Sequence, residues 1–485
     1  MIFLRGSENT VSTDYDVVIL GGGPVGSLMA VLCNDVGLSN IVIDRDAVPY
    51  QLPRAMVMDD EIQRLFHDHE LGEWLTANTT RVTMADFVDA EHNRIMGAEI
   101  PKMGLLGVPP IVCHYQPELD TMLRAEAEKR GSAVRWGHTA TALAHDDNGV
   151  RLTLDNGEVI SGRWLVGCDG ASSWTRKTVG LTLTDLGFDQ EWLVVDVELL
   201  PGKGDTLPEG VRQYCDPVRP STYVKGHARY RRWEFQVQEH EDASALNTEE
   251  GLWRLLQPWL TPAEAHIVRS AVYRFHAVVA PQWRTGSVFL AGDSCHQMPP
   301  FMGQGLNSGM RDAINLAWKM SFVKRGLADD RLLDTYSEER VAHVRHIVSH
   351  AADLGRLIDQ IAGRASHGVS EDSGYGGARP QPFLEHGFVW GDNPRVGHQF
   401  WYHPDVSCAV RHDGVSCVVV AATDIELPRE LTAIGAQLVV APESAGESYA
   451  VVVRPDRYVA AVAGDSAELA AFAATLGSHG FIVTA

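Results

Sequence analysis

The chain has 485 residues, of which 45% are hydrophobic and 21% are charged, so it can bury large cores and should fold into two or three domains. Its 63 acidic residues outnumber the 41 basic ones and give a formal net charge of -22. An acidic chain without a basic stripe argues against nucleic acid and anionic membrane surfaces as partners.

The first predicted elements are a strand, a turn, a helix and a second strand. Residues 16–20 (DVVIL) are apolar and β-branched, and they lead into GGGPVG and a helical pattern that ends at Gly37. Residues 41–44 (IVID) are typical of another buried strand. Because a helix connects the two strands, we expect a parallel sheet. Residues 14–190 are therefore assigned to the first part of a Rossmann-like domain.

The middle of the chain changes to strand-like alternation with turn residues between the segments, from Trp192 to about Glu239. This pattern predicts a mainly antiparallel sheet over residues 191–275, inserted into the nucleotide-binding domain. Residues 276–363 return to that domain with an apolar strand at 287–293 and a long helix from about Asn307.

The rest of the chain is divided into a linker and a small domain. Residues 364–398 are rich in Gly, Pro and polar side chains, which predicts a linker or a covering loop. Residues 399–485 contain alternating strand and helix patterns. The predicted fold class is therefore α/β, with an inserted β-sheet and a small C-terminal α/β domain.

The first chemical motif is Gly21-x-Gly23-x-x-Gly26, placed between the first strand and the first helix. Gly21 permits the tight turn, Gly23 lets the backbone approach a pyrophosphate, and Gly26 lets the helix pack on the strand. Asp44 ends the next strand, where a carboxylate binds a ribose hydroxyl and disfavours a 2′-phosphate. The motif predicts FAD or NAD rather than NADP; the alternative is a glycine-rich turn without a ligand.

Two further motifs follow buried strands. Residues 168–176 read CDGASSWTR, and residues 291–313 read AGDSCHQMPPFMGQGLNSGMRDA. Asp293 stands at a strand end, and Gly303, Gly305 and Asn307 precede a helix whose N-terminal amides offer an anion site. In a purely structural interpretation, both segments are turn-rich loops, the second with a helix cap.

Together the three motifs resemble the single-component FAD-dependent aromatic hydroxylases of the p-hydroxybenzoate hydroxylase class. Their order and spacing match over roughly the first 350 residues. The segments LPRAMVMDDE, CDPVRP, RRWEF and GQGLNSGMRDAINLAWKM are most similar to 3-(3-hydroxyphenyl)propionate hydroxylases. The tail resembles the thioredoxin-like C-terminal domain of larger family members but lacks CxxC, which implies a packing or dimer role.

The resemblance implies roles for individual residues. The glycine motif and Asp44 should hold the ADP part of FAD, and Asp293 should bind the ribityl hydroxyls. Without the resemblance, Arg54 would be interpreted as part of a surface salt bridge and Gln116 as a polar residue at a helix start. The expected cofactor-binding residues are Gly21, Gly23, Pro24, Gly26, Asp44, Arg45, Arg54, Gln116, Asp169, Gly170, Arg176, Gly292, Asp293, Pro300, Gly303, Gln304, Gly305, Leu306 and Asn307.

The implied reaction hydroxylates a phenol or another small aromatic substrate. NADH or NADPH would reduce a non-covalent FAD, O₂ would add to give a C4a-hydroperoxide, and its distal oxygen would attack the ring in a dry pocket. Pro300, Tyr223 and His227 are the expected catalytic residues. The expected substrate-binding residues, each also compatible with a plain core position, are Arg212, Tyr223, Trp233, Phe235, Phe301 and Met302.

Other classes of function stay open at this point. A reductase or oxidase would keep the FAD without inserting oxygen, a tailoring hydroxylase would act on a larger polycyclic or heteroaromatic compound, and a scaffold would bind FAD without turnover. No metal site is expected, because the histidines at 343, 346 and 350 have no HExxH motif or completing carboxylate. Cys295 replaces the alanine usual in such relatives and is expected to be a small buried side chain, with a reactive thiol as the alternative.

The same sequence predicts a cytoplasmic protein. Its N-terminus lacks the apolar core of a signal peptide, no stretch approaches eighteen apolar residues, and its seven cysteines contain no CxxC pair. The family resemblance also implies a homodimer.

Overall fold

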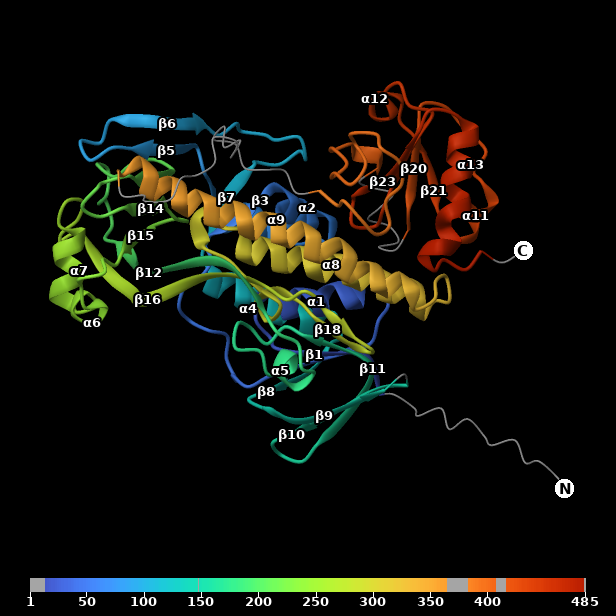
Figure 1. The fold of residues 1–485 in the computed structure, drawn as a ribbon, viewed down its shortest axis with the longest axis horizontal. Helices are drawn as coiled ribbons and strands as arrows, with labels where there is room; N and C mark the ends of the chain where they lie inside the picture. The colour runs from blue at the N-terminus through green and yellow to red at the C-terminus, as the bar shows by residue number, and fades with distance from the viewer. Residues whose placement is uncertain (1–13, 147, 364–382, 407–415, 484–485) are drawn as a thin grey trace.

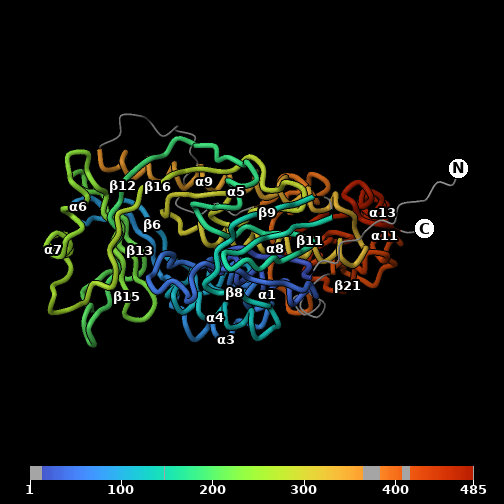
Figure 2. Tube along the Cα trace, turned by 90° about the horizontal axis from the view of Figure 1, so that it is seen from below, coloured from blue at the N-terminus to red at the C-terminus, as the bar shows by residue number. Residues whose placement is uncertain are grey.

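The computed structural model describes residues 14–146, 148–363, 383–406 and 416–483. Three units follow one another along the long axis: a large sheet with two short helices at one end, a central sheet with long helices, and a small α/β unit at the other end (Figures 1 and 2). Residues 364–382 of the expected linker lie outside the described residues, as do 407–415 and 484–485 of the expected C-terminal domain.

The central sheet contains the predicted strand–turn–helix–strand unit. β1 (Tyr15–Leu20) pairs in parallel with β2 (Asn40–Asp44) and with β11 (Val159–Gly167), and its apolar side chains are buried on both faces. β18 (Val288–Leu290) pairs in parallel with β11, so the chain that follows the insertion returns beside Gly167. The strand order is β17-β18-β11-β1-β2-β8, and β10 pairs with both β11 and β9. The strands not yet given are β8 (Ala133–Trp136), β9 (Ala140–Asp146), β10 (Gly149–Leu154) and β17 (Arg284–Thr285).

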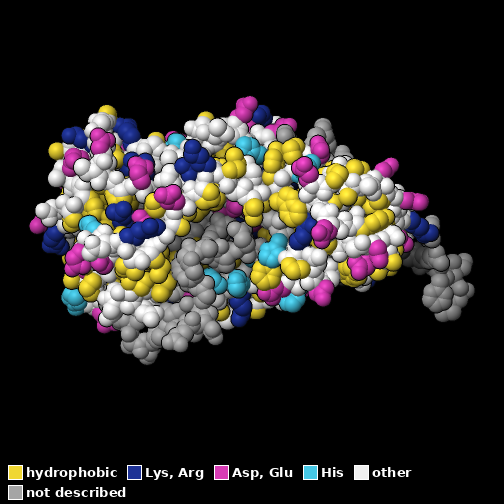
Figure 3. All heavy atoms as spheres, turned by 90° about the horizontal axis from the view of Figure 1, so that it is seen from above, with side chains coloured by type: hydrophobic (Ala, Val, Ile, Leu, Met, Phe, Trp, Pro, Cys, Tyr) yellow, Lys and Arg dark blue, Asp and Glu magenta, His cyan; other side chains and the backbone are white. Residues whose placement is uncertain are grey.

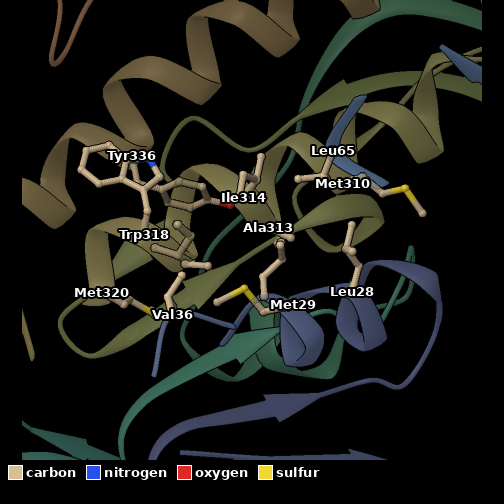
Figure 4. Packing of buried hydrophobic residues seen from close by; sticks show 14 of the residues in the cluster. Leu28, Met29, Val36, Leu65, Met310, Ala313, Ile314, Trp318, Met320 and Tyr336 are labelled. Carbon is tan, nitrogen blue, oxygen red and sulfur yellow. The ribbon is translucent and has the colours of Figure 1, made fainter. Parts of the chain in front are cut away.

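Long helices form the main core with this sheet. α1 (Pro24–Asp35) packs against α4 (Gln116–Lys129) and α8 (Gln304–Lys324), and α9 (Arg331–Ile361) packs against α8. Figure 4 shows the contact between α1 and α8, where Met29 lies against Ala313. Because α8 is buried along nearly its whole length, its N-terminus is fixed in place.

The second sheet has eight strands in the order β19-β16-β12-β15-β14-β13-β5-β6 and is antiparallel except for the β13–β5 pair. β12 begins at Thr184, and β5 and β6 come from residues 84–99. With β16 ending at Val279 and β19 at residues 296–297, the sheet draws on all three of the ranges 14–190, 191–275 and 276–363. Short strands such as β5 carry no signal of which sheet they join. Its strands are β5 (Met84–Val88), β6 (Arg94–Glu99), β12 (Thr184–Leu199), β13 (Val211–Tyr214), β14 (Ser221–Lys225), β15 (Tyr230–Gln236), β16 (Ala265–Val279) and β19 (His296–Gln297).

The two faces of this sheet have different neighbours. Leucines of α6 (Ala243–Leu246) and α7 (Glu249–Leu256) form a core with one face. The other face lies toward α9 and the loop around Phe301. A three-stranded sheet and short helices complete this part of the chain: β3 (Val57–Asp59), β4 (Thr79–Arg81), β7 (Ile111–His114), α2 (Asp60–Asp68), α3 (Gly72–Ala77) and α5 (Trp174–Thr178).

The C-terminal unit is a small α/β domain, as expected. Its sheet has the order β21-β20-β22-β23, in which β20 and β21 are parallel and the other pairs are antiparallel. Valines of β20 and β22 are fully buried in its core. Its elements are β20 (Val418–Ala421), β21 (Gln437–Val440), β22 (Ala450–Val453), β23 (Val459–Ala463), α11 (Arg429–Ala433), α12 (Pro442–Ala445) and α13 (Ser466–Thr475).

The surface carries charges of both signs. On the face drawn in Figure 3, basic and acidic side chains are intermingled and form no single basic stripe. Within the described ranges, no helix is both long enough and apolar enough to cross a membrane.

Candidate functional site

The glycine turn after β1 is tightly built at two of its three motif positions. Gly21 has a φ of +107°, and a Cβ there would lie 2.4 Å from the carbonyl oxygen of Cys168. A Cβ on Gly26 would lie 1.9 Å from the carbonyl oxygen of Gly21. Both positions therefore require glycine for the protein's own packing of turn, helix and neighbouring loop.

The third motif position is different, because no atom lies within 4 Å of a Cβ built on Gly23. Gly23 caps α1 with ordinary backbone angles and without a side-chain hydrogen bond, and Pro24 follows at the first helical position. The open space therefore lies beside the free amides of the helix N-terminus. This arrangement fits a phosphate group of a dinucleotide.

Asp44 at the end of β2 closes the turn. Its carboxylate accepts a hydrogen bond from the amide of Gly22 at 2.5 Å and lies 3.3 Å from the guanidinium of Arg124 on α4. Arg124 also donates to the carbonyl oxygen of Gly22 at 2.9 Å. Arg124 was not predicted from the sequence, because an arginine inside a helix carries no motif. Arg45 points outward, with 79% of its side chain exposed.

Gln116 fixes the segment that carries Arg54. The Gln116 side chain is buried at the start of α4, and its carbonyl oxygen accepts hydrogen bonds from the amides of Ala55 at 2.5 Å and Arg54 at 3.2 Å. The Arg54 guanidinium lies 4.9 Å from the ring centre of Tyr50 and has no ion-pair partner among the described residues. Gln116 thus holds the backbone that carries the Arg54 guanidinium. This is a more specific role than that of a polar residue at a helix start.

The loop at 168–176 is connected to the loop at 291–303. Asp169 accepts hydrogen bonds from Ser173 at 2.6 Å and from the amide of Thr175 at 2.8 Å, so its carboxylate stabilises its own turn. Arg176 is buried and donates to the carbonyl oxygen of Ser294 at 2.6 Å. Gly170 has a φ of +76° and open space beside it. The second and third motifs therefore form one structural unit.

Asp293 is the exposed member of the third motif. It lies in the 3₁₀ turn Gly292–Ser294, and its carboxylate has no hydrogen-bond partner among the described residues. The surrounding protein raises the pKa of Asp293, while the nearby charges of His296 and Arg54 lower it. Because the Asp293 carboxylate is accessible and accepts no hydrogen bond from the described residues, it is suited to accept hydrogen bonds from the hydroxyl groups of a ligand.

A buried cluster holds this turn. Asp312 on α8 accepts hydrogen bonds from the amide of Gly292 at 2.9 Å and from Arg340 at 2.8 Å, and its Oδ2 lies 2.8 Å from Nε2 of His296. Cys295, His296 and Asp312 also form the one group in the described part of the chain with metal-ligand spacing. Because the Arg340 guanidinium already supplies the positive charge, we interpret the cluster as structural. Cys295 is a small buried side chain, as expected.

The approach to α8 is open on one side. Gly303 adopts left-handed angles after the 3₁₀ turn Pro300–Met302, and a Cβ on Gly305 would meet nothing within 4 Å. The side chain of Asn307 accepts from the amide of Asp59 and donates to the carbonyl oxygen of Gly303. Asn307 thus anchors the helix start with its side chain. Gln304 is buried and binds Arg311, and Leu306 packs against the main core.

The structure separates the expected substrate residues into two groups. Phe301 and Met302 lie in an apolar cluster with the end of α9, and Phe301 contacts Trp192 with ring centres 5.2 Å apart. Tyr223, Trp233 and Phe235 lie on the opposite face of the second sheet, where they form the core with α6 and α7. Their assignment to substrate contact is not supported, because alternation along a strand does not reveal which face meets the site.

The two polar candidates also lie away from Phe301. Arg212 stands opposite Tyr223 in the β13–β14 register and forms an ion pair of 3.8 Å with Asp86. Cross-strand partners share a face, so Arg212 belongs to the face toward α7. His227 lies in the turn between β14 and β15, with Nδ1 3.0 Å from the hydroxyl of Thr80. Burial raises the pKa of Tyr223, whose hydroxyl has no partner.

The residues that alternate with Tyr223, Trp233 and Phe235 lie on the face toward Phe301 and were not predicted from the sequence. Opposite side chains of β12 and β15 pair Trp192 with Gln236 and Val194 with Glu234. Because Trp192 contacts Phe301, these side chains share the face that meets the apolar cluster. The signal was present in RRWEFQ, where polar residues occupy every second position.

A model of the family described as "FAD binding domain" matches residues 14–351, which include all three motifs. The chain belongs to this family. The expectation of an FAD-binding protein is thereby confirmed, and the open spaces beside Gly23 and Gly305, the free carboxylate of Asp293 and the free cation of Arg54 are compatible with FAD.

The curated relatives are aromatic hydroxylases by name. The chain is 36% identical over 348 residues to the probable NADH-specific resorcinol 4-hydroxylase of Rhodococcus jostii, covering 70% of this chain and 65% of that protein. It is 32% identical over 358 residues to the 3-(3-hydroxy-phenyl)propionate/3-hydroxycinnamic acid hydroxylase of Escherichia coli, covering 72% and 64%. The chain thus spans slightly less than two thirds of the length of either relative, and the resemblance identified from the motifs is confirmed.

Solved structures support the fold class. Aklavinone-11 hydroxylase in complex with FAD and aklavinone matches with a TM-score of 0.81 at 21% identity, covering 97% of this chain and 98% of that one. The p-nitrophenol 4-monooxygenase of Pseudomonas putida matches with a TM-score of 0.66 at 21% identity, covering 74% and 91%. The expected α/β architecture with an inserted sheet is confirmed.

Proposed function

We propose that this chain is an FAD-dependent monooxygenase that uses NADH and O₂ to hydroxylate a phenolic substrate. One short loop carries the argument. Asp293, whose free carboxylate fits the cofactor, is followed eight residues later by Phe301, which lies against the aromatic face of the second sheet. The cofactor site and an apolar wall are therefore held side by side on the loop that precedes α8.

This chain would contact FAD along the whole length of the cofactor. The amides at the start of α1 and Asp44 suit the ADP part, Arg54 suits the pyrophosphate, and Asp293 suits the ribityl chain. FAD, when bound, supplies the transfer of electrons from a nicotinamide to O₂ and the insertion of oxygen into a ring. The protein's own contribution is to bind, orient and exclude water.

Exclusion of water is supported by the aromatic side chains around Phe301. Phe188, Trp192 and Phe275 each meet the Phe301 ring at a steep angle, with ring centres 5.2 to 6.3 Å apart. Such edge-to-face contacts hold the rings in fixed positions beyond simple burial. A dry, rigid wall is what oxygen insertion needs, because water diverts the reaction to peroxide.

The names of the relatives support a phenolic ring as the substrate. One is named for resorcinol and another for a hydroxyphenylpropionate, and the first is named as NADH-specific. A structure of similar fold contains the polycyclic compound aklavinone. We therefore propose a small phenol first and a larger hydroxylated ring system as the alternative.

The test is NADH oxidation by the FAD-loaded protein with resorcinol and 3-(3-hydroxyphenyl)propionate, with catalase present. We expect a phenol that accelerates NADH oxidation and returns with one oxygen atom derived from isotopically labelled O₂. Acceleration with all oxygen recovered as peroxide would instead identify a reductase or oxidase. Bound FAD without any turnover would identify a scaffold.

Two further expectations belong with this proposal. We propose that the protein is a homodimer, as its hydroxylase resemblance implies, and that it is cytoplasmic, as its seven cysteines without a CxxC pair indicate. Light scattering on the purified FAD-loaded protein tests the dimer, and fractionation of the cells that produce it tests the location.

A further inference from the structure

Glu234 on β15 is a buried polar side chain that has no role in the proposed reaction as described so far. Its neighbours on the same strand face show where it points. Arg232 donates to the carbonyl oxygen of Arg54 at 2.6 Å, and Gln236 donates to Asp359 of α9 at 3.2 Å. Glu234 stands between them on the strand, so its side chain projects from the same face, between the Arg54 segment and the end of α9.

The other polar groups on this face already have partners. Asp196 accepts from Arg232 at 2.7 Å and lies 3.6 Å from Arg269. The Thr222 hydroxyl donates to Gln213 at 2.6 Å.

Glu234 is the exception on this face. It is 5% exposed and has no hydrogen bond among the described residues. The nearest cation is the guanidinium of Arg232 at 3.9 Å, which is already engaged by Asp196. Its carboxylate oxygens are not among the fully enclosed atoms that lack a partner, so they keep some access from outside. A nearly buried carboxyl without a protein hydrogen bond is a group that a ligand can satisfy.

The charges around Glu234 come from its own strand and from three neighbouring elements. Arg232 and Asp196 face it from β15 and β12, Arg269 lies beyond Asp196 on β16, and Asp359 stands on α9. The adjacent strand β14 presents the uncharged Thr222. Burial raises the pKa of Glu234 to about 7, the charge of Arg232 lowers it and the charge of Asp196 raises it further. The group can therefore take up or release a proton near neutral pH.

We propose that Glu234 contacts the substrate and accepts a hydrogen bond from a ring hydroxyl, so that the site selects uncharged hydroxyaromatic compounds over aromatic carboxylates. This inference rests on the proposed function. When the proton moves, the phenol O–H bond breaks, an O–H bond forms on the Glu234 carboxylate, and the electron pair stays on the ring oxygen. The ring thereby becomes more nucleophilic without any change in oxidation state.

Selection against carboxylates follows from the ion pairs on the same face. Both cations there, Arg232 and Arg269, share Asp196. Arg212, the cation that the sequence suggested for a substrate carboxylate, lies on the other face with Asp86. A substrate carboxylate would therefore meet ionised Glu234 without a free cation on this face of the described sheet, and like charges at short range repel strongly.

The experiment compares the binding of resorcinol and 3-hydroxybenzoate to the FAD-loaded protein, using the change in flavin absorbance. Glu234→Gln keeps the shape and removes the charge, and Glu239→Gln, an exposed glutamate on the loop after the same strand, is the matched control. In the wild type and the control, we expect resorcinol to bind at least about tenfold more tightly above neutral pH. In Glu234→Gln, we expect resorcinol to weaken by about tenfold and the preference to disappear.

The pH profile provides a second readout. In the wild type, kcat/KM for hydroxylation should rise through about pH 7 as Glu234 ionises. Glu234→Gln should lose this rise at unchanged FAD content, whereas Glu234→Asp should keep it. Proton transfer by a side chain accelerates reactions by about 10²–10⁴-fold, which sets the expected loss in kcat/KM.

The outcomes separate this inference from the proposed function. If phenols produce only peroxide, the hydroxylase proposal fails, while the binding comparison still tests Glu234. If hydroxylation proceeds but Glu234→Gln keeps the wild-type dissociation constants and pH profile, the role of Glu234 is overturned. Wild-type protein that does not bind resorcinol more tightly than 3-hydroxybenzoate overturns the proposed selectivity.

Discussion

The guanidinium of Arg454, just after β22, donates to both carboxylate oxygens of Glu339 in α9, at 2.9 and 2.7 Å. Both side chains are completely buried. Lys319 of α8 donates to the same carboxylate at 2.7 Å, and Asp456 balances the second positive charge. The C-terminal domain is thus joined to α9 directly and, through Lys319, to α8, the helix that begins at the candidate FAD site. This arrangement supports a packing role for a tail that lacks CxxC.

The first prediction is that Arg454→Met destabilises the whole protein. The substitution keeps the volume of the stem but leaves Glu339 and Asp456 with only Lys319 as a buried counter-charge. Removing one partner of a buried ion pair costs about 3–5 kcal/mol. Chemical denaturation should show this loss in the free energy of unfolding. Arg331→Met is the control, because its ion pair with Asp329 is exposed and is worth about 0–1 kcal/mol.

The second prediction separates two glycines of one motif. Gly26→Ala should disrupt folding of the turn, because the new Cβ would overlap the carbonyl oxygen of Gly21. Gly23→Ala should fold normally, since Gly23 has ordinary backbone angles and open space beside it, but the methyl group should occupy space needed by the cofactor. Circular dichroism and the FAD content after gel filtration measure the two effects. Full retention of FAD by Gly23→Ala would contradict the assignment of this space to the cofactor.

These glycines show what the sequence could reveal. Gly21, Gly26 and Asp44 act within about twenty residues of one another, and local spacing is enough to predict their geometry. Arg124 binds the same turn from 102 residues away in the chain, and nothing local marks it. Long-range partners of this kind become visible only once the strands and helices are assembled.

The face of a strand is the second limit. In RRWEFQ the sequence shows alternation, but not that Trp233 meets α7 while Glu234 faces the apolar cluster around Phe301. Large aromatic residues attracted the prediction of substrate contact, although burying them is what the core of the inserted domain needs. The buried acid beside Trp233 was the more informative residue, because carboxylates are rarely buried without a hydrogen bond or a close ion pair, and Glu234 has only the distant contact with Arg232.

The third prediction concerns acid stability. His114 on β7 is 1% exposed, and neither ring nitrogen has a hydrogen-bond partner. Burial, with the charges of His227 and Arg232, lowers its pKa from 6.5 to about 3. Between these values the unfolded chain binds a proton that the folded chain does not, so stability falls as the pH drops through this window. His114→Leu should flatten this part of the stability curve by about 1.4 kcal/mol per pH unit.

Thermal unfolding over a series of acidic buffers measures the effect. His240→Leu, at an exposed position, should keep the wild-type slope. An unchanged slope in His114→Leu would show that other groups dominate acid unfolding.

The last prediction addresses Tyr223, which the sequence suggested as a catalytic residue. Its ring lies 4.9 Å from that of Trp233 in the core beneath α7, and its buried hydroxyl has no hydrogen-bond partner. Tyr223→Phe removes a polar atom that gains nothing from burial, so the free energy of unfolding should stay equal or rise. Because the side chain faces away from Phe301 and Phe keeps the ring in place, kcat and KM should stay within about twofold of the wild type. A loss of kcat by about 10²-fold or more at unchanged stability would restore Tyr223 to the reaction. The expected result instead leaves proton transfer to Glu234, which lies on the face toward Phe301 and has no hydrogen bond among the described residues.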